Sequence, residues 1–427
     1  MINKLIDTKR LKEKIKHDYK RIFSTSKHFV LALIIGISVG FIAGLFGYLL
    51  QKVTTLRLSD PRLLYLLPFG AMLIVGMYQF VLKTKDPGTN LVISAVHSGD
   101  RLPLRMAPLI FVSTIITHLV GGSAGREGAA LQLGGSIGNA FGRLFKIEQK
   151  EDRNIMIMCG MSAAFSALFG TPIAAAVFSM EVISVGIMHY AALLPCAVAS
   201  LIARAIASHF FGIASPYYDI LKPPTFTVSS AIKASVLAML CGLISILFCI
   251  ILHQMNHIFQ TLFKNAYLRA FAGGCIVLLM TMIVGNQTYN GTGTDMISQC
   301  MNGEIHSAAF ALKIFFTAIT LACGYKGGEI VPSFFIGAAF GSMFGNLLGF
   351  SPSLCSAVGM GALFCGVTNC PITSLLICFE LFGFEGTPYF LLAVGFSYMV
   401  SGYYGLYSSQ KIVYSKYKSN YIDKQAK

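Results

Sequence analysis

One acidic side chain, Glu127, stands inside a glycine-rich interruption of an apolar segment. The interruption, residues 121–128, reads GGSAGREG, and helical periodicity resumes at Ala129. A helix that begins here presents unpaired amide groups and a partial positive charge, which together form an anion site. A carboxylate at membrane depth is costly unless it is paired or protonated. We therefore expect Glu127 to occupy the anion site and to leave it when protonated. The alternative interpretation is that Glu127 pairs with Arg126 in a loop outside the hydrocarbon.

The second half of the chain repeats this interruption. Residues 324–332 read GYKGGEIVP, so Gly328 stands at a distance of 203 residues from Gly125 (328 − 125). The same offset relates four further pairs: Gly134 to Gly337, Gly138 to Gly341, Gly142 to Gly345, and Gly88-Thr89 to Gly291-Thr292. Farther along, an offset of 199 relates Pro172 to Pro371 and Glu181 to Glu380 (371 − 172, 380 − 181). The pattern predicts two homologous halves, 29–215 and 228–408, joined by a polar, proline-rich linker at 216–227.

Four helix starts are predicted by the two repeats. Gly88 and Gly291 open one equivalent pair, and the segments around Gly125 and Gly328 open the other. Pro332 lies in the first turn of its helix, where the missing N–H costs nothing. Repeats in a membrane protein point to a transporter with its site at the repeat interface, near the midplane. Four partial charges, none of them a full cation, would hold an anion weakly enough for it to leave.

Composition identifies the chain as a membrane protein. Hydrophobic residues make up 55% of the 427 residues and charged residues only 12%, against about 25% charged in soluble domains. Apolar runs such as 29–50 and 63–82 are long enough to cross a bilayer. Others, such as 389–400, are too short, which predicts broken or re-entrant helices covered by protein.

The net charge of +15 gathers largely at the two ends of the chain. Residues 1–28 predict a basic amphipathic helix on the cytoplasmic face, and 409–427 a basic cytoplasmic tail. We expect a multi-pass protein of the cell membrane with both termini in the cytoplasm. Nucleic-acid binding is the competing interpretation of a basic patch, but the adjacent spans argue against it.

Other reactive side chains have structural interpretations. The eleven cysteines show no zinc spacing and are expected to be buried apolar residues. His118 is expected to pack in the core. Glu181 and Glu380 are expected to bond to neighbours at helix ends, and Glu329 to cap amide groups or pair with Lys326. No catalytic role, metal or required cofactor is predicted, and a structural monovalent cation is left open.

Three motifs resemble those of the chloride-channel (CLC) superfamily. Residues 125–128, GREG, resemble the GREGP motif whose glutamate is the external gate. Residues 328–332, GEIVP, resemble GxFxP, and 406–408, LYS, resemble the segment that carries the central tyrosine. The resemblance covers roughly residues 30–410. It implies an all-α polytopic fold of two inverted repeats with broken and re-entrant helices. It also implies a homodimer with one anion pathway in each subunit.

Departures from the common motifs point to one branch of the superfamily. Thr89 stands near the place of the chloride-contacting serine, Ala129 replaces a proline and Ile330 a phenylalanine. Val182 stands where chloride/proton exchangers carry their internal proton-transfer glutamate. Segments similar to the fluoride-exporting CLC-F branch are 90–92, 105–108, 122–128, 326–329, 380–383 and 401–407. This resemblance implies export of fluoride in exchange for protons.

Residue roles follow from the resemblance. Glu127 would be the gate and the proton carrier, and the motif residues around the two helix starts are Gly125, Arg126, Gly328, Glu329 and Pro332. The anion would be bound by the Tyr407 hydroxyl, by the backbone N–H groups of Gly128, Ile330 and Val331, and by Thr89.

Two other function classes remain open at this stage. A chloride/proton exchanger or a chloride channel would belong to the same superfamily. A sodium-coupled transporter of an organic solute would also use broken helices, but it does not predict the paired glycine motifs with a central tyrosine. A purely structural membrane protein is disfavoured by a carboxylate at a helix start in the membrane.

Overall fold

The chain is almost wholly helical in a computed structural model that describes residues 8–82, 88–99, 102–221 and 223–427. The helices of the first half are α1 (Thr8–Ser59), α2 (Leu67–Leu82), α3 (Thr89–Ser98), α4 (Met106–Val120), α5 (Glu127–Leu144), α6 (Lys150–Phe169), α7 (Pro172–Glu181) and α8 (Leu193–Phe211). Those of the second half are α9 (Val228–Leu262), α10 (Ala266–Val284), α11 (Thr294–Asn302), α12 (Ala309–Ala322), α13 (Ile330–Leu347), α14 (Pro352–Thr368), α15 (Pro371–Phe382) and α16 (Thr387–Val400). Two 3₁₀ turns, Pro61–Leu66 and Tyr190–Ala192, complete the helical elements of the described residues.

The two halves supply equivalent helices in the same order. The four predicted helix starts are all present, at α3, α5, α11 and α13. The segment between α8 and α9, which contains the predicted linker 216–227, holds neither helix nor strand in its described part. Equivalent starts are close to the predicted offset, because α5 begins at Glu127 and α13 at Ile330.

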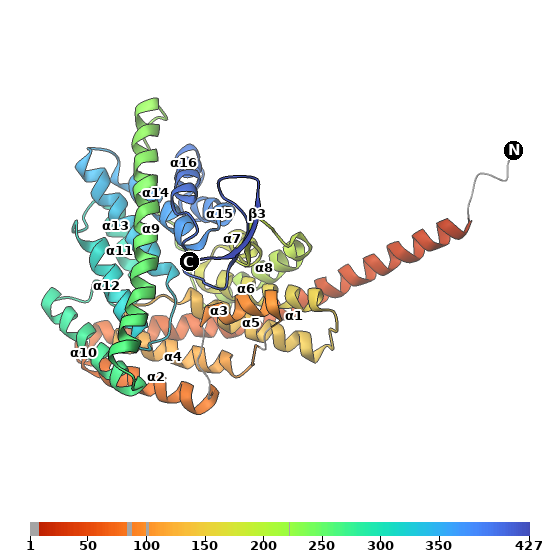
Figure 1. Ribbon diagram of the computed structural model, residues 1–427, viewed down its shortest axis with the longest axis horizontal. Helices are drawn as coiled ribbons and strands as arrows, with labels where there is room; N and C mark the ends of the chain where they lie inside the picture. Colours follow the sequence, from red (N-terminus) through yellow and green to blue (C-terminus); the bar gives the residue numbers. More distant parts are fainter. Residues whose placement is uncertain (1–7, 83–87, 100–101, 222) are drawn as a thin grey trace.

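Helix α1 is longer than its apolar run. It continues unbroken from Thr8 to Ser59, so the basic segment predicted at 1–28 and the first apolar run form one helix, with residues 1–7 outside the described part. Figure 1 shows the N-terminal part of α1 projecting away from the body of the molecule. The second-half counterpart, α9, is also long, and Figure 1 shows it crossing the body vertically, with α11, α12 and α13 on one side and α16 on the other.

Helix lengths fit a protein that spans a membrane several times. Six segments are long and apolar enough to cross: Ser26–Ser59, Pro61–Val81, Tyr190–Phe211, Val228–Leu262, Ala266–Val284 and Ile330–Leu347. Six shorter apolar helices of 10–17 residues accompany them, among them α7, α12 and α15. The mixture of complete and short helices agrees with the predicted broken and re-entrant segments.

Glycines bring the central helices into contact. A Cβ atom on Gly134 of α5 would lie 2.0 Å from the carbonyl oxygen of Gly160 in α6, and one on Gly337 of α13 would lie 2.3 Å from that of Gly359 in α14. Small residues allow membrane helices to approach at backbone distance where there is no hydrophobic driving force between them. The repeated glycine spacing therefore specifies two equivalent helix pairs, α5–α6 and α13–α14, which hold α5 and α13 in place.

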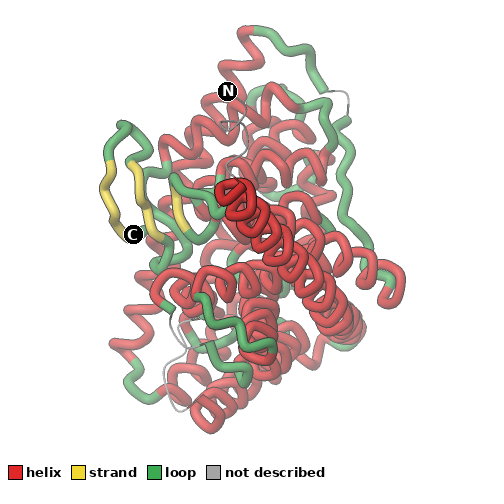
Figure 2. The backbone as a smooth tube through the Cα atoms, turned by 90° about the vertical axis from the view of Figure 1, so that its right-hand side faces the viewer, coloured by secondary structure: helices red, strands yellow, loops and turns green. Residues whose placement is uncertain are grey.

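Three short strands were not predicted. Strand β1 (Ser184–Val185) follows α7, and it pairs in parallel with β2 (Lys411–Tyr414), which pairs antiparallel with β3 (Tyr421–Gln425). Figure 2 shows this small sheet at one edge of the helical body. The basic tail thus folds back onto the first half of the chain.

Candidate functional site

The two glycine-rich interruptions meet at one point. The Gly125 amide donates to the Gly328 carbonyl at 2.6 Å, and the Gly328 amide donates to the Gly125 carbonyl at 2.8 Å. These residues are equivalent in the repeat, so the paired bonds mark a local two-fold relation between the halves. The starts of α5 and α13 therefore lie side by side, as the repeat predicts.

Glycine is required at this contact because the backbones nearly touch. A Cβ atom on Gly328 would lie 2.5 Å from the Gly128 nitrogen, and one on Gly128 would lie 3.0 Å from the Gly328 Cα. No side chain separates the two helix starts. The amides of the first turn of each helix have no acceptor within that helix. Pro332, which has no N–H, lies in the first turn of α13, so no intrahelical hydrogen bond is lost there.

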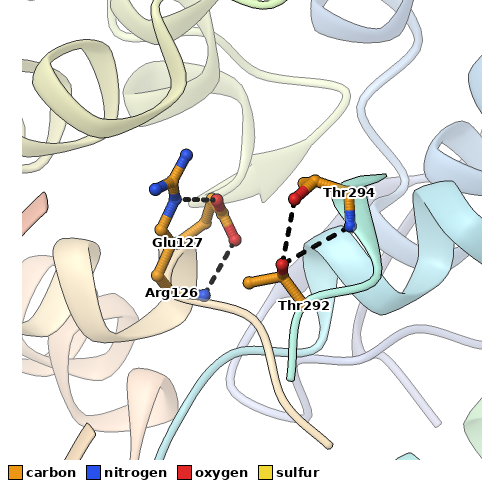
Figure 3. A network of polar contacts seen from close by, with 4 residues as sticks. All are labelled: Arg126, Glu127, Thr292 and Thr294. Atoms are coloured by element: carbon orange, nitrogen blue, oxygen red, sulfur yellow. Dashed lines mark hydrogen bonds and ion pairs between the residues drawn. The ribbon is translucent and has the colours of Figure 1, made fainter. Parts of the chain in front are cut away.

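Glu127 is the first residue of α5 and its side chain is 0% exposed. One carboxylate oxygen, Oε2, accepts from the Arg126 amide at 3.0 Å. The other, Oε1, lies 3.5 Å from Arg126 Nε and has no hydrogen-bond partner among the described residues. Figure 3 shows this pair. Glu127 thus pairs with Arg126, as one interpretation expected, but at a buried helix start and not in an exposed loop.

Thr89 reaches the start of α5 from α3. Its hydroxyl donates to the Gly128 carbonyl at 3.3 Å and accepts from Gln132 Nε2 at 3.3 Å. Gly88, with a φ of 64°, turns the chain into α3, a conformation that favours glycine. The predicted anion-contacting threonine therefore lies beside the start of α5, with its proton directed to a backbone oxygen.

Tyr407 approaches from the segment after α16. The neighbouring Leu406 amide donates to the Val367 carbonyl at 2.8 Å, which fixes this segment against α14. The Tyr407 hydroxyl is buried and has no hydrogen-bond partner among the described residues. An unpartnered buried donor is costly, so the geometry favours an acceptor, such as an anion, at this position.

A cavity of about 1000 Å³ reaches Thr89, whereas Glu127 and Tyr407 do not line it. Thr89, Gln132, Lys326, Glu329 and Leu406 are among its lining residues. The cavity thus joins the first half, through α3 and α5, to the second half, through the α12–α13 loop. Its polar lining suits the passage of a hydrated ion.

Glu329 differs from its expected capping role. It precedes α13, but its side chain makes no cap hydrogen bond. It borders the cavity together with Lys326, and its pairing with Lys326 stays a prediction. The adjacent Ile330 and Val331 are buried in the first turn of α13, where their amide groups are directed toward the start of the helix.

The remaining residues that the sequence singled out make structural contacts. Glu181 and Glu380 bond to backbone groups at helix starts, in agreement with the expected structural role. Val182 follows α7, and its carbonyl accepts from Gln410 at 3.1 Å. His118 is buried in α4, and its ring lies near the Gly125 carbonyl.

Two buried cations escaped the sequence analysis. Lys313 in α12 is 0% exposed, and its ammonium donates to the Gly291 carbonyl at 2.8 Å and to the Tyr289 carbonyl at 3.1 Å. Arg57 at the end of α1 is 3% exposed and contacts the His118 carbonyl at 3.4 Å. A single lysine in an apolar segment is a signal for function in membrane proteins, and it could have identified Lys313.

Metal binding finds no support in the described residues. No group of three or more histidine, cysteine, aspartate or glutamate side chains there has a metal-binding arrangement. The eleven cysteines are free, and all except the half-buried Cys275 are buried, as expected of small apolar residues.

Comparisons with known proteins place this architecture in a family. Residues 70–402 match the voltage gated chloride channel family. The chain is 32% identical to a chloride/fluoride channel protein of Pseudomonas syringae pv. tomato, over 92% of this chain and 88% of that protein. It is 26% identical to the H(+)/Cl(-) exchange transporter ClcA of Vibrio cholerae, over 60% of this chain and 58% of that protein. The protein is thus a polytopic membrane protein, and it belongs to the voltage gated chloride channel (CLC) family.

Solved structures show the same fold. A CLC-type fluoride/proton antiporter superposes with a TM-score of 0.86 at 31% identity, over 90% of this chain and 98% of that chain. A slow cyanobacterial Cl-/H+ antiporter superposes with a TM-score of 0.72 at 21% identity, over 88% and 94%. The fold of two inverted repeats with broken helices is therefore confirmed.

Proposed function

We propose that this protein exchanges fluoride for protons and exports fluoride, with Glu127 as both gate and proton carrier. The observation that carries the proposal is the Glu127 carboxylate, buried at the meeting point of α5 and α13, with one oxygen that has no hydrogen-bond partner among the described residues. A carboxylate held by helix starts occupies a place suited to an anion. Protonation removes its charge, releases it and admits the anion, so one proton moves in each exchange step.

The fluoride assignment draws on residues and on relatives. Thr89 stands where chloride transporters carry a serine, and Val182 stands where exchangers carry the internal glutamate. The similarity at 31–32% identity to a chloride/fluoride channel protein and to a fluoride/proton antiporter extends over about nine tenths of the chain. Fluoride gives up its hydration only to close donors. Gly128, Ile330, Val331, Thr89 and Tyr407 are the proposed donors.

The proposed setting is the cell membrane. Both termini would lie in the cytoplasm, because the basic residues of the chain concentrate at its two ends. The working form would be a homodimer with a separate pathway in each subunit, as in the family. We propose that an exchange driven by the two ion gradients requires no cofactor and involves no enzymatic reaction.

The decisive experiment measures fluoride and chloride efflux from liposomes that contain the purified protein. Fluoride electrode and proton traces would be recorded in parallel for wild type, Glu127→Gln and Glu148→Gln. Glu148 is an exposed carboxylate on the α5–α6 loop and serves as the matched control. We expect fast fluoride efflux with opposing proton movement in wild type and in the control, and loss of proton movement in Glu127→Gln. Chloride flux equal to or greater than fluoride flux would refute the fluoride assignment and leave a chloride transporter.

A further inference from the structure

Two threonines of the second half face the gate from the start of α11. Figure 3 shows Thr292 and Thr294 beside the Arg126–Glu127 pair, with the carboxylate of Glu127 turned toward them. The two hydroxyl oxygens lie 3.0 Å apart, and the Thr294 amide donates to the Thr292 hydroxyl oxygen at 3.4 Å. Gly293, with a φ of 82°, turns the chain so that both side chains meet at the helix start.

The hydrogen bond between Thr292 and Thr294 uses only one of their two hydroxyl protons. Each hydroxyl carries one proton, and a single proton serves the bond between Thr292 and Thr294. Whichever hydroxyl donates, the other, which is half-buried, keeps a proton with no acceptor among the described residues. Glu127 Oε1 lies 3.5 Å from Arg126 Nε and also lacks a hydrogen-bond partner among the described residues. The spare donor thus lies on the side toward which the Glu127 carboxylate is turned (Figure 3).

Two buried cations support the loop that carries the threonines. Lys313 binds the Gly291 carbonyl at 2.8 Å, and its ammonium would lie 3.4 Å from a Cβ on Gly293. The Arg57 guanidinium would lie 2.9 Å from a Cβ on Gly291, and its Nε has no hydrogen-bond partner. Among the described residues neither cation has a carboxylate within 4 Å. The exposed Asp295 interacts with Arg57 only at longer range.

Carbonyl oxygens, and no carboxylate of the described residues, therefore accept the hydrogen bonds of Arg57 and Lys313. Burying a cation without a counter-ion is unfavourable, and an anion at the α11 start would relieve that cost for both Arg57 and Lys313. The partial positive charge of the helix start acts in the same direction. These three sources of positive potential converge on the loop 291–294.

We propose that Thr292 and Thr294 form an outer anion site, which takes the transported anion when it exchanges with the Glu127 carboxylate. This inference rests on the proposed anion/proton exchange and adds a binding step to it. The ligand is a small inorganic anion, held by hydroxyl donors and by the charge of Arg57 and Lys313. Fluoride fits best, because a small hard anion gains most from O–H donors.

The outer site is distinct from the groups around Thr89. Thr292 is the repeat equivalent of Thr89, since 292 − 89 = 203. Thr89 lines the large cavity together with Gln132, whereas neither Thr292 nor Thr294 borders it. In an inverted repeat, equivalent residues lie on opposite sides of the midplane. The two threonine positions therefore flank Glu127, one on each side of the gate.

The test replaces the hydroxyls and keeps the shape. Thr292→Val/Thr294→Val removes both donors, Thr292→Ser/Thr294→Ser keeps them, and Thr288→Val is a control in the same loop. Anion flux from liposomes is measured as a function of fluoride and of chloride concentration, with proton flux in parallel. Anion binding to the detergent-solubilised protein is measured by isothermal titration calorimetry. The calorimetry tests the site even where no transport occurs.

We expect the valine double variant to raise the half-saturating anion concentration and the dissociation constant about tenfold, since a hydrogen bond to a charged group contributes that much. The maximal flux and the proton-to-anion ratio should stay within about twofold, which a general structural defect would not preserve. The serine variant should restore wild-type affinity. Should the double variant fold poorly, each single valine variant is expected to show about a threefold effect.

The proposal would be overturned if the half-saturating anion concentration and the dissociation constant of the valine variants both stayed within twofold of the wild-type values. Failure of the fluoride assignment gives a different result. In that case the wild-type protein moves chloride in preference to fluoride, and the effect of the valine variants is measured on chloride flux and chloride binding.

Discussion

Glu181 and Glu380 each cap the helix that carries the other. The Glu181 carboxylate, at the end of α7, accepts from the amides of Ile372 and Thr373 at 3.0 and 2.8 Å, at the start of α15. The Glu380 carboxylate, near the end of α15, accepts from two amides in the first turn of α7 at 3.0 and 2.8 Å. The two glutamates are repeat equivalents, so the exchange of caps expresses the same two-fold relation as the Gly125–Gly328 bonds. Each carboxylate also complements the positive end of the helix it reaches.

Removal of either cap is expected to destabilise the fold. Glu181→Ala should lower the free energy of unfolding by about 1–3 kcal/mol, because buried amides lose their acceptors. Glu380→Ala should cost less, because Glu380 is more exposed than Glu181. Thermal unfolding of the purified protein in detergent measures both effects. Glu385→Ala, an exposed carboxylate just after α15, should leave the transition unchanged, and an equal result for Glu181→Ala would contradict the capping role.

Backbone contact at the gate predicts a strong effect of one methyl group. In Gly328→Ala the new Cβ would lie 2.5 Å from the Gly128 nitrogen, so α5 and α13 would have to separate. We expect transport to fall at least about tenfold, since displacements of about 1 Å at a site can cost a hundredfold. Efflux per folded protein, quantified after size-exclusion chromatography, is the measurement.

Gly395→Ala provides the matched control for this substitution. Gly395 lies inside α16 with no atom within 4 Å of an added Cβ. Alanine is the better helix former by roughly 1 kcal/mol in soluble helices, so stability should not fall and transport should be retained. Full activity of Gly328→Ala would show that the two helix starts tolerate separation.

Much of this site was predictable because its signals are local. A helix start needs only its own glycines and the polar residue beside them, and the repeat supplies each start twice. The same holds for Glu181 and Glu380, whose equivalent places at helix ends predicted bonds to neighbours. The repeat shows which starts are equivalent, and the structure shows that only the pair at Gly125 and Gly328, among the described equivalents, is joined by direct backbone hydrogen bonds.

The unpredicted features depend on contacts between distant segments. Arg57 follows an apolar run and looks like an interfacial anchor, and it is buried by the packing of α1 against the end of α4 and the loop at Gly291. The tail forms strands because β2 pairs with β1, which lies more than 200 residues earlier in the chain (411 − 184 = 227). A stretch as charged and short as 409–427 carries little periodicity from which strands could be inferred.

The tail also buries a lysine whose charge predicts a pH dependence. Lys416 donates from Nζ to Asn369, to the Tyr398 carbonyl and to the Ser401 hydroxyl, the last two at 3.1 Å. Burial lowers the pKa of Lys416 from 10.5 to about 8. Below pH 8 the folded and unfolded chains both carry this proton, and the cost of burying the charge is fully present. Between pH 8 and 10.5 only the unfolded chain binds the proton, so this group makes the free energy of unfolding rise with pH.

Lys416→Met should remove this rise. Relative to the variant, wild type is expected to gain on the order of 2 kcal/mol of stability between pH 8 and pH 10.5. Denaturant titrations in detergent across this pH range give the free energy of unfolding of both proteins. In the difference between wild type and Lys416→Met, the contributions of all other titrating groups cancel. Lys418→Met, an exposed neighbour, should track wild type. A constant difference between wild type and Lys416→Met would mean that Lys416 stays protonated throughout.

The unpartnered hydroxyl of Tyr407 predicts a loss of anion affinity without a loss of fold. Tyr407→Phe removes a buried donor that has no acceptor among the described residues, so the free energy of unfolding should stay the same or increase. The anion loses one hydrogen bond, which should raise its dissociation constant roughly three- to tenfold. Calorimetric titration with fluoride and with chloride, beside thermal unfolding, separates the two effects. Tyr404→Phe, a half-buried tyrosine in the same segment, should bind as wild type does. Reduced stability of Tyr407→Phe with unchanged affinity would show that the hydroxyl serves the fold and not the ion.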